Sequence, residues 1–415
     1  MLALLGSNTV WAVTDSAATL FADLQPDVFQ IRVMDRGSGD KYTIGSGFLV
    51  SDQGHIATNF HVVSAFVHEP DKYRLEYVTH EEAVFPAELL TVDVVHDLAL
   101  LQGASASSGY LPLSDTDLVN GERIFSMGNP HDLGMTIIEG NFNGLLQHSR
   151  YRKILFSGSL NSGMSGGPAF NQKGEVIGVN VSTGGEQISF LVPVSHLAVL
   201  LEKARNLTEP DYSRAFIMDS LLQDQQDFYT EMLEQPFASE LLGEVRVATE
   251  LSDSLKCWGH SVDNKTSDQA ATWLGVHQHC QSEDRIYLSS DLYIGEFYYD
   301  YEWITTDSLS SVPFYHYVSQ RYRHNTPDSS YSREDVSDYS CTNAVIELSQ
   351  LPWKISTCFR RYKEYPSLFD ASLVLVSTRY GDKTLVAKIG ASGISRDNAT
   401  RVFRRFMERI EWTHK

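Results

Sequence analysis

Three side chains that together can make a serine nucleophile occur in the first half of the chain, in the order His61, Asp97, Ser165. A serine hydroxyl is a poor nucleophile at neutral pH, so it needs a base within hydrogen-bond reach. The base in turn needs an acid that fixes its tautomer and stabilises its cation. The pattern therefore predicts acyl transfer at Ser165, with His61 as the base and Asp97 as the orienting acid.

Ser165 lies in the segment NSGMSGGP, residues 161–168, where glycines flank the serine. Taken alone, such a segment can equally be a tight turn that requires glycine. Oxyanion holes use backbone N–H groups, and a bulky side chain at Gly163 would hinder the turn that aims them. The predicted oxyanion hole comprises Gly163, Met164 and Ser165, and the N–H groups of Gly163 and Ser165 are the expected donors.

Strands and turns are expected to position these residues. Residues 27–192 contain many short apolar runs punctuated by Gly and Asn, which is typical of an all-β barrel or sandwich. His61 ends one such run, and we expect a strand to deliver its side chain to a surface cleft. Asp97 opens the run DLALL, whose buried neighbours could shield the carboxylate. Alternation points the neighbouring His96 the other way, as an exposed or edge residue.

Several segments, in the right order, resemble successive blocks of HtrA/Deg-type trypsin-like serine proteases. They are GSGFLVSDQGHIATNFHVV, PAELLTVDVVHDLALL, GERIFSMGNP and NSGMSGGPAFNQKGEVIGVNVS, and they lie within residues 40–200. The resemblance implies a trypsin-like (chymotrypsin-fold) all-β double barrel over residues 13–205. It places the catalytic triad of His61, Asp97 and Ser165 in the cleft between the barrels, and it requires no metal or organic cofactor.

The same resemblance suggests where substrate specificity is set. It places the base of the primary specificity pocket near Ser159 and the pocket wall near Ser189 and Phe190. Because Ser159 is small and carries no charge, we expect a preference for small or medium apolar residues on the acyl side.

Some positions depart from the family pattern. Met164 stands where these enzymes usually have Asn before the nucleophile, and Phe60 replaces a frequent Asn before the histidine. Neither change touches a triad atom, so we expect catalysis to survive and the cleft lining to differ. No segment after residue 205 resembles the PDZ domains typical of the family.

A different pattern begins at Pro193. Helical spacing over 195–207, with Ser195 as a cap, and again over about 212–235, predicts a helical connector across residues 206–242. A separate α+β C-terminal domain of unknown function follows over 243–415. It contains an alternating aromatic face, a helix around 308–322, a hairpin over 372–390 and a closing helix over 395–412. The aromatic face, formed by Phe297, Tyr299, Tyr301 and Trp303, is either the packed side of a sheet or a ligand-stacking surface.

Four cysteines, all in the second half, form two locally spaced pairs, Cys257 with Cys280 and Cys341 with Cys358. This usage predicts two disulfide bonds and an oxidising compartment. Free thiols are one alternative. A zinc site is another, with the candidate ligands Cys257, His260, His277, His279 and Cys280.

The first twelve residues, MLALLGSNTVWA, resemble the remnant of a secretory signal peptide, with a possible cut after Ala12. The usual positive segment before the apolar stretch is missing, so an apolar N-terminal strand is the alternative. Together with the cysteines, this segment predicts an extracytoplasmic location, either periplasmic or secreted.

The formal net charge of −20 at pH 7 argues against nucleic-acid or anionic-membrane partners, since both are polyanions. No apolar run approaches the roughly 20 residues of an integral membrane segment. The sequence thus predicts an exported serine endopeptidase that acts on protein or peptide substrates. The alternative is a catalytically latent protease-fold binding or scaffold protein that acts through its C-terminal domain, which could also recruit substrate, regulate or inhibit.

Overall fold

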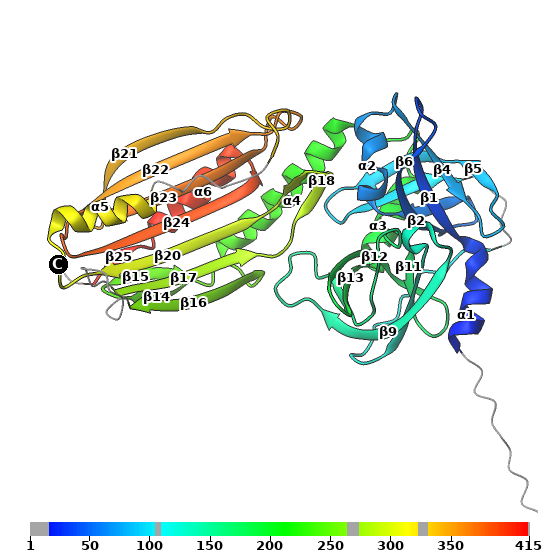
Figure 1. The fold of residues 1–415 in the computed structure, drawn as a ribbon, viewed down its shortest axis with the longest axis horizontal. Helices are drawn as coiled ribbons and strands as arrows, with labels where there is room; N and C mark the ends of the chain where they lie inside the picture. Colours follow the sequence, from blue (N-terminus) through cyan, green and yellow to red (C-terminus); the bar gives the residue numbers. More distant parts are fainter. Residues whose placement is uncertain (1–15, 104–108, 264–273, 323–330, 414–415) are drawn as a thin grey trace, which may run out of the picture. The chain divides into compact units, whose positions relative to one another are not determined.

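The fold is taken from a computed structural model, which describes residues 16–103, 109–263, 274–322 and 331–413 (Figure 1). The predicted signal remnant over residues 1–12 therefore lies outside the described residues. The chain forms two compact units. The first comprises Met1–Thr91, Leu98–Gly144 and Ile154–Pro210, and the second comprises Val92–Asp97, Leu145–Lys153 and Asp211–Lys415.

The first unit begins with a seven-stranded sheet, in which neighbouring strands are mostly joined by short turns. Its strand order is β5-β4-β1-β2-β3-β7-β6. The bounds are β1 Val28–Asp35, β2 Lys41–Leu49, β3 His55–Thr58, β4 Tyr73–Val78, β5 Val84–Pro86, β6 Glu88–Asp93 and β7 Leu98–Gln102. One helix, α2 (Phe60–His68), follows β3 directly.

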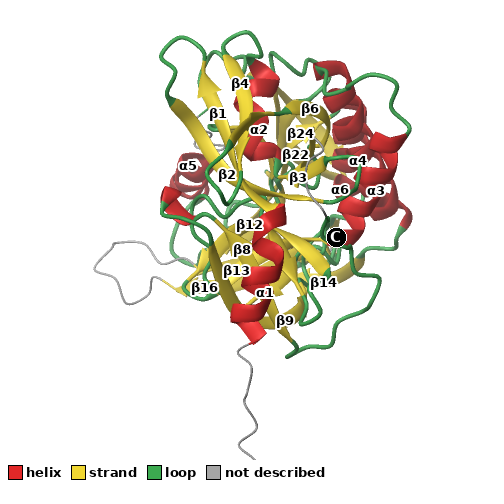
Figure 2. Cartoon of the chain, turned by 90° about the vertical axis from the view of Figure 1, so that its right-hand side faces the viewer, coloured by secondary structure: helices red, strands yellow, loops and turns green. Residues whose placement is uncertain are grey.

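The second sheet of this unit closes into a six-stranded barrel in the order β10-β13-β12-β11-β8-β9. The bounds are β8 Arg123–Gly128, β9 Thr136–Leu145, β10 Ile154–Phe156, β11 Pro168–Phe170, β12 Val176–Gly185 and β13 Ile188–Pro193. The predicted all-β class of this half of the chain is confirmed, with one open and one closed sheet (Figure 2, strands in yellow).

One apolar core joins the two sheets of the first unit. It contains Phe48 from β2 and Leu98 from β7 together with Phe125 from β8 and Val176 from β12. Helices α1 (Ser16–Leu24) and α3 (Val194–Arg205) add further side chains to the same core. The helix predicted over 195–207 is confirmed, but Pro193 occupies the cap position and Ser195 lies inside the helix.

The second unit is built on a seven-stranded antiparallel sheet in the order β16-β17-β20-β24-β23-β22-β21. The bounds are β16 Leu255–Asp263, β17 Leu274–Ser282, β20 Phe297–Thr305, β21 Ser340–Leu348, β22 Leu351–Arg361, β23 Phe369–Ser377 and β24 Lys383–Ile394. A three-stranded sheet contains β14 (Ala238–Leu242), β15 (Val245–Thr249) and β25 (Glu411–Trp412). A two-stranded sheet contains β18 (Ile286–Ser289) and β19 (Leu292–Ile294). The α+β class predicted here is confirmed.

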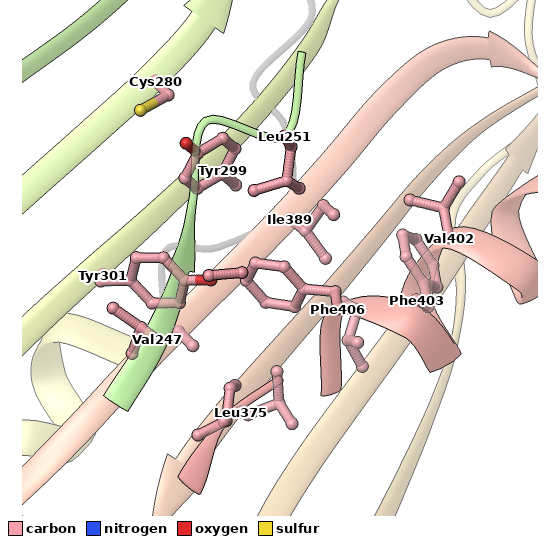
Figure 3. Packing of buried hydrophobic residues seen from close by; sticks show 14 of the residues in the cluster. Val247, Leu251, Cys280, Tyr299, Tyr301, Leu375, Ile389, Val402, Phe403 and Phe406 are labelled. Atoms are coloured by element: carbon pink, nitrogen blue, oxygen red, sulfur yellow. The ribbon is translucent and has the colours of Figure 1, made fainter. Parts of the chain in front are cut away.

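Period-two alternation along β20 buries one face of the strand almost completely and the other face only in part. On one face, Tyr301 stacks on Phe406 of helix α6 (Arg396–Met407) with ring centroids 5.3 Å apart, and Tyr299 lies beside it (Figure 3). On the other face, Ile304 packs with Phe314 of helix α5 (Ser311–Tyr322). The predicted aromatic face is thus the packed side of the sheet and is buried throughout.

Helix α4 (Arg214–Glu234) is part of the second unit's core, where Tyr229 and Met232 pack under the sheet. The segment predicted as a connector therefore contains a helix that belongs to the C-terminal unit rather than one that stands between two domains. The predicted helices near 308–322 and 395–412 correspond to α5 and α6, and the predicted hairpin corresponds to β23 and β24.

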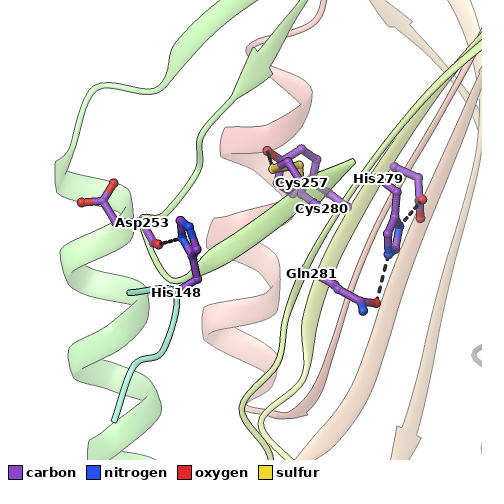
Figure 4. Close-up of a disulfide and its surroundings, with 8 residues drawn as sticks. His148, Asp253, Cys257, His279, Cys280 and Gln281 are labelled. Carbon is purple, nitrogen blue, oxygen red and sulfur yellow. Dashed lines mark hydrogen bonds and ion pairs between the residues drawn. A yellow bond between two sulfur atoms is a disulfide. The ribbon is translucent and has the colours of Figure 1, made fainter. Parts of the chain in front are cut away.

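Both predicted disulfides are present, and each joins directly opposed residues of neighbouring antiparallel strands. Cys257 of β16 faces Cys280 of β17 (Figure 4), and Cys341 of β21 faces Cys358 of β22. The zinc alternative therefore loses its two thiolate ligands. Of the other candidates, His277 and His279 both contact the Asp300 carboxylate, at 3.3 and 2.6 Å.

Among the described helices, none combines the length and the apolar character that a bilayer crossing requires.

Truncating Phe406 should destabilise the second unit strongly, because its ring is fully buried between the sheet and α6. For Phe406→Ala we expect the free energy of unfolding to fall by about 3–5 kcal/mol. Val345→Ala on the exposed edge strand β21 serves as the control and should change it by less than about 0.5 kcal/mol. Denaturant unfolding of both variants checks this, and equal effects would contradict the assigned core.

Alkaline pH should weaken the same core, because burial raises the pKa of Tyr299 from 10.0 to about 12. Between these values the unfolded chain releases the phenolic proton while the folded chain retains it. Stability therefore falls as pH rises, by about 1.4 kcal/mol per pH unit for this residue. Tyr299→Phe should flatten the decline by that amount in unfolding curves recorded between pH 10 and 12. Parallel declines in wild type and variant would refute the assignment.

Candidate active site

The turn that carries Ser165 connects β10 and β11, and most of its backbone donors are engaged. Met164 N donates to Asn161 O at 3.0 Å, Gly167 N donates to Met164 O at 3.0 Å, and Gly166 N donates to Asn180 O at 2.9 Å. Within the described part of the chain, the N–H groups of Gly163 and Ser165 donate no hydrogen bond. Of the three residues predicted for the oxyanion hole, these two keep an available donor, whereas the Met164 donor is occupied.

Two glycines of this turn have backbone conformations that other residues rarely adopt. Gly163 has φ +94° and Gly166 has φ +84°. A Cβ at Gly163 would collide with the Asn129 carbonyl oxygen, and one at Gly166 would collide with the Ser46 carbonyl oxygen. The glycines are therefore required both for the turn and for its close packing.

Ser46, on β2, clamps the turn from the first sheet. Its N–H donates to Ser165 O at 2.7 Å, and its hydroxyl donates to Gly163 O at 2.7 Å. The same hydroxyl accepts a hydrogen bond from Asn129 N at 3.0 Å. Ser46 is fully buried, so each of these bonds is shielded from competing water.

Asn180, on β12, clamps the turn from the closed barrel. Its side-chain amide donates to Met164 O at 3.1 Å and to Met127 O at 3.0 Å, while its Oδ1 accepts from Ser126 Oγ at 2.8 Å. Its main chain also accepts from Gly166 N and donates to Gly167 O. Sequence reasoning missed this residue and Ser46, although Asn180 lies between two valines and Ser46 between two glycines.

His61 is placed by a helix and not by a strand, which corrects the sequence-based expectation. Strand β3 ends at Thr58, and His61 lies half-buried in the first turn of α2. The nucleophile turn packs directly against this helix start, because a Cβ at Gly166 would lie 2.9 Å from Asn59 N. The segments that carry the predicted base and the predicted nucleophile are therefore neighbours.

Asp97 is the residue immediately before β7. Strands β7 and β3 are antiparallel, with Ala99 opposite Thr58, so the start of β7 and the end of β3 lie at the same end of the pair. This end of β3 leads into the helix that carries His61. Asp97 has φ +56°, a left-handed conformation that costs on the order of 1 kcal/mol for a residue other than glycine.

We expected His96 to be an exposed or edge residue, and its side chain is half-buried. Its Nδ1 lies 2.7 Å from Asp93 Oδ2, and its backbone N–H donates to the other oxygen of the same carboxylate at 3.1 Å. The two bonds close a tight turn directly before Asp97.

The three predicted pocket residues differ in exposure. Ser159 is exposed and Phe190 is half-buried, while Ser189 is buried and its hydroxyl accepts a hydrogen bond from Leu160 N at 3.0 Å. This bond links β13 to the loop that follows Ser159. The assignment of these residues to a specificity pocket stays a prediction.

Met164 and Phe60 were expected to change the cleft lining, and that expectation is wrong for both side chains. Each is 0 % exposed. Met164 points into the core of the closed barrel, where it packs with Phe156 and Leu160. The unusual residue before the nucleophile is therefore accommodated by barrel packing, and its side chain is not part of the surface around Ser165.

The sequence was compared with protein families and curated proteins. Residues 45–179 match the model of the trypsin-like peptidase domain. Serine protease HTRA1 of Xenopus tropicalis is 32% identical over 174 residues, covering 39% of this chain and 36% of its own. The mitochondrial serine protease HTRA2 of Drosophila ananassae is 32% identical over 189 residues, covering 43% of each chain. The chain thus spans less than half the length of these curated relatives.

Among solved structures, the serine endoprotease from Yersinia pestis is 26% identical, with a TM-score of 0.42, covering 47% of this chain and 69% of its own. Deg5 is 25% identical, with a TM-score of 0.38, covering 44% of this chain and 90% of its own. The family match and the curated relatives confirm the resemblance of the first unit to HtrA-type trypsin-like serine proteases.

Removing the Asn180 side chain should destabilise the first unit, because Asn180→Ala removes the amide donor to Met127 O and Met164 O and the acceptor of the buried Ser126 hydroxyl. We expect the free energy of unfolding to fall by at least about 1–3 kcal/mol. Asn143→Ala, on the exposed side of β9, is the matched control and should cost less than about 0.5 kcal/mol. Chemical denaturation compares them, and an unaffected Asn180 variant would show that the clamp is dispensable.

Proposed function

We propose that this protein is an exported serine endopeptidase that hydrolyses peptide bonds through His61, Asp97 and Ser165. The observation that carries the proposal is the turn around Ser165, in which the N–H groups of Gly163 and Ser165 are left without a hydrogen-bond acceptor among the described residues. Two such donors beside a serine are what a tetrahedral oxyanion requires. The confirmed resemblance to HtrA-type proteases supports the same chemistry.

In the proposed reaction, Ser165 Oγ attacks the carbonyl carbon of the scissile bond while His61 accepts the hydroxyl proton. The N–H groups of Gly163 and Ser165 stabilise the oxyanion that forms. His61 then returns the proton to the leaving amine, the C–N bond breaks, and an acyl-enzyme remains. Water, deprotonated by His61, hydrolyses this ester and regenerates Ser165. Asp97 holds the imidazole in the correct tautomer and stabilises its cation throughout.

The proposed substrates are proteins or peptides with a small or medium apolar residue on the acyl side of the cleaved bond. This proposal rests on Ser159, which carries no charge. The predicted pocket wall, Ser189 and Phe190, carries no charge either, and the Ser189 hydroxyl accepts a hydrogen bond from Leu160 N.

Export is proposed because the two disulfides of the second unit require an oxidising environment to persist. The apolar segment at residues 1–12 is proposed as part of the targeting signal.

One observation favours the alternative of a latent, protease-fold binding protein. In the described part of the chain, the Ser165 hydroxyl forms no hydrogen bond, so the nucleophile is not engaged with a base in this conformation. Such contacts often tighten only when substrate binds. Reactivity of the full chain decides between the two functions.

A fluorophosphonate probe should label the full-length protein at Ser165. Labelling should disappear in Ser165→Ala, and His61→Ala should lower peptidase kcat by about 10⁴-fold or more, because the hydroxyl then lacks its base. Mass spectrometry of the labelled peptide identifies the modified residue, and a fluorogenic peptide assay gives the rates.

Ser162→Ala serves as the control, since Ser162 is the nearest exposed serine in the chain and should retain full labelling. A correctly folded wild type that remains unlabelled would sink the peptidase proposal in favour of the latent binding protein.

A further inference from the structure

Two segments of the N-terminal half fold with the C-terminal unit. One is Val92–Asp97, which ends at the proposed orienting acid, and the other is Leu145–Lys153, which lies between β9 and β10. Each is joined by a peptide bond to a strand of the first unit. Residues that fold with the C-terminal unit are therefore the direct chain neighbours of β7 and β10.

The second of these segments is fixed by two carboxylates of the C-terminal unit. Arg150 Nη2 donates to Asp224 Oδ2 at 2.6 Å, and Tyr151 Oη donates to the same oxygen at 3.2 Å. From the other side, Ser149 Oγ and Arg150 N donate to the two oxygens of Asp284 at 2.9 and 2.6 Å. Charge-assisted bonds of this kind are shorter and stronger than neutral ones.

The Arg150–Asp224 ion pair is largely withdrawn from water, with side-chain exposures of 9% and 18%. The guanidinium also lies 4.0 Å from the ring centroid of Phe228, which is one turn further along α4. An ion pair in such a place contributes little net stability but fixes geometry, since loss of either partner leaves a buried charge. Its role is therefore to hold the segment in one position.

The contacts continue from this pair to the residue beside Asp97. The ring of Tyr151 packs edge-on against the ring of His96, with centroids 5.5 Å apart. His96 closes the turn with Asp93, and Asp97 follows in its left-handed conformation. A cavity of about 560 Å³ is lined by His96, Tyr151 and Asp224, so these side chains have room to shift once a polar contact is removed.

We propose that Asp224, on helix α4 of the C-terminal unit, is a positioning residue for the orienting acid Asp97. Asp224 fixes Arg150 and Tyr151, Tyr151 supports His96, and His96 sets the turn that ends at Asp97. The inference rests on the proposed peptidase function. It assigns to the C-terminal unit a supporting role in catalysis, in place of an inhibitory one.

The test compares Asp224→Asn with Asp370→Asn in the full-length protein. Asp370 is a closely matched control, because it is 5% exposed and also binds an arginine, Arg360, and a tyrosine hydroxyl, that of Tyr362. It lies on β23, outside the two segments that adjoin the catalytic strands. For Asp224→Asn we expect kcat for a fluorogenic peptide to fall by about 10- to 100-fold with KM nearly unchanged. Asp370→Asn should keep the wild-type kcat once the folded fraction, measured by circular dichroism, is taken into account.

A double-mutant cycle separates positioning from general stability. If Asp224 acts through Asp97, Asp224→Asn should have no further effect on kcat or on the fluorophosphonate labelling rate in the Asp97→Asn background. Independent, multiplicative losses would overturn the proposal, as would equal losses in the Asp224 and Asp370 variants. An active wild type with an unimpaired Asp224→Asn variant would refute the positioning role alone. A wild type that never labels would refute the peptidase function, and the positioning role would fall with it.

Discussion

One constraint shapes the turn around Ser165: two of its backbone N–H groups, those of Gly163 and Ser165, have no hydrogen-bond acceptor among the described residues. Buried donors of this kind are costly, so the turn that presents them must be held by its remaining polar groups. The carbonyl groups of Gly163, Met164 and Ser165 all accept hydrogen bonds, and Gly166 and Gly167 donate their own. These bonds hold the turn around the two N–H groups that we propose as the oxyanion-hole donors.

The bonds that meet this constraint come from both sheets of the first unit. Ser46 lies on β2 and Asn180 on β12, more than 130 residues apart in the chain, and the turn at Ser165 lies between them. A shared apolar core joins the two sheets and so fixes the distance between the two clamps. The geometry of the turn is consequently a property of the whole unit and cannot be attributed to the glycine-rich segment alone.

Local pattern predicted the elements whose environment is repetitive. The alternation of Phe297, Tyr299, Tyr301 and Trp303 predicted a strand with one aromatic face, because successive side chains of a strand point to opposite faces of the sheet. Their burial in the structure shows that this face is the packed one. The local spacing of the cysteines predicted both disulfides. In the structure the two cysteines of each pair lie directly opposite each other on neighbouring strands. The turn at Ser165 could be proposed as a nucleophile site because glycine, serine and proline carry strong local preferences.

Long-range packing decided the rest. His61 ends an apolar run that predicted a strand, yet the chain turns into α2 there, with Phe60 and Val63 buried on one helical face. Met164 was expected to alter the cleft lining, but in the closed barrel its side chain fills a core. Likewise, nothing local to residues 92–97 or 145–153 indicates that they fold with a unit that begins at Asp211.

The second unit contains the same chemical arrangement twice, used in two ways. Asp370 and Arg360 are directly opposite on β23 and β22, so their ion pair reinforces a register that the strand hydrogen bonds already set. Asp224 and Arg150 are 74 residues apart and share no strand ladder, so their ion pair is itself what specifies where the loop lies. Since desolvation removes most of the net energy of both pairs, stability explains neither of them well. A buried ion pair matters most for structure where no other interaction fixes the same geometry. The Asp224–Arg150 pair is in such a position, and it lies next to the segment that ends at Asp97.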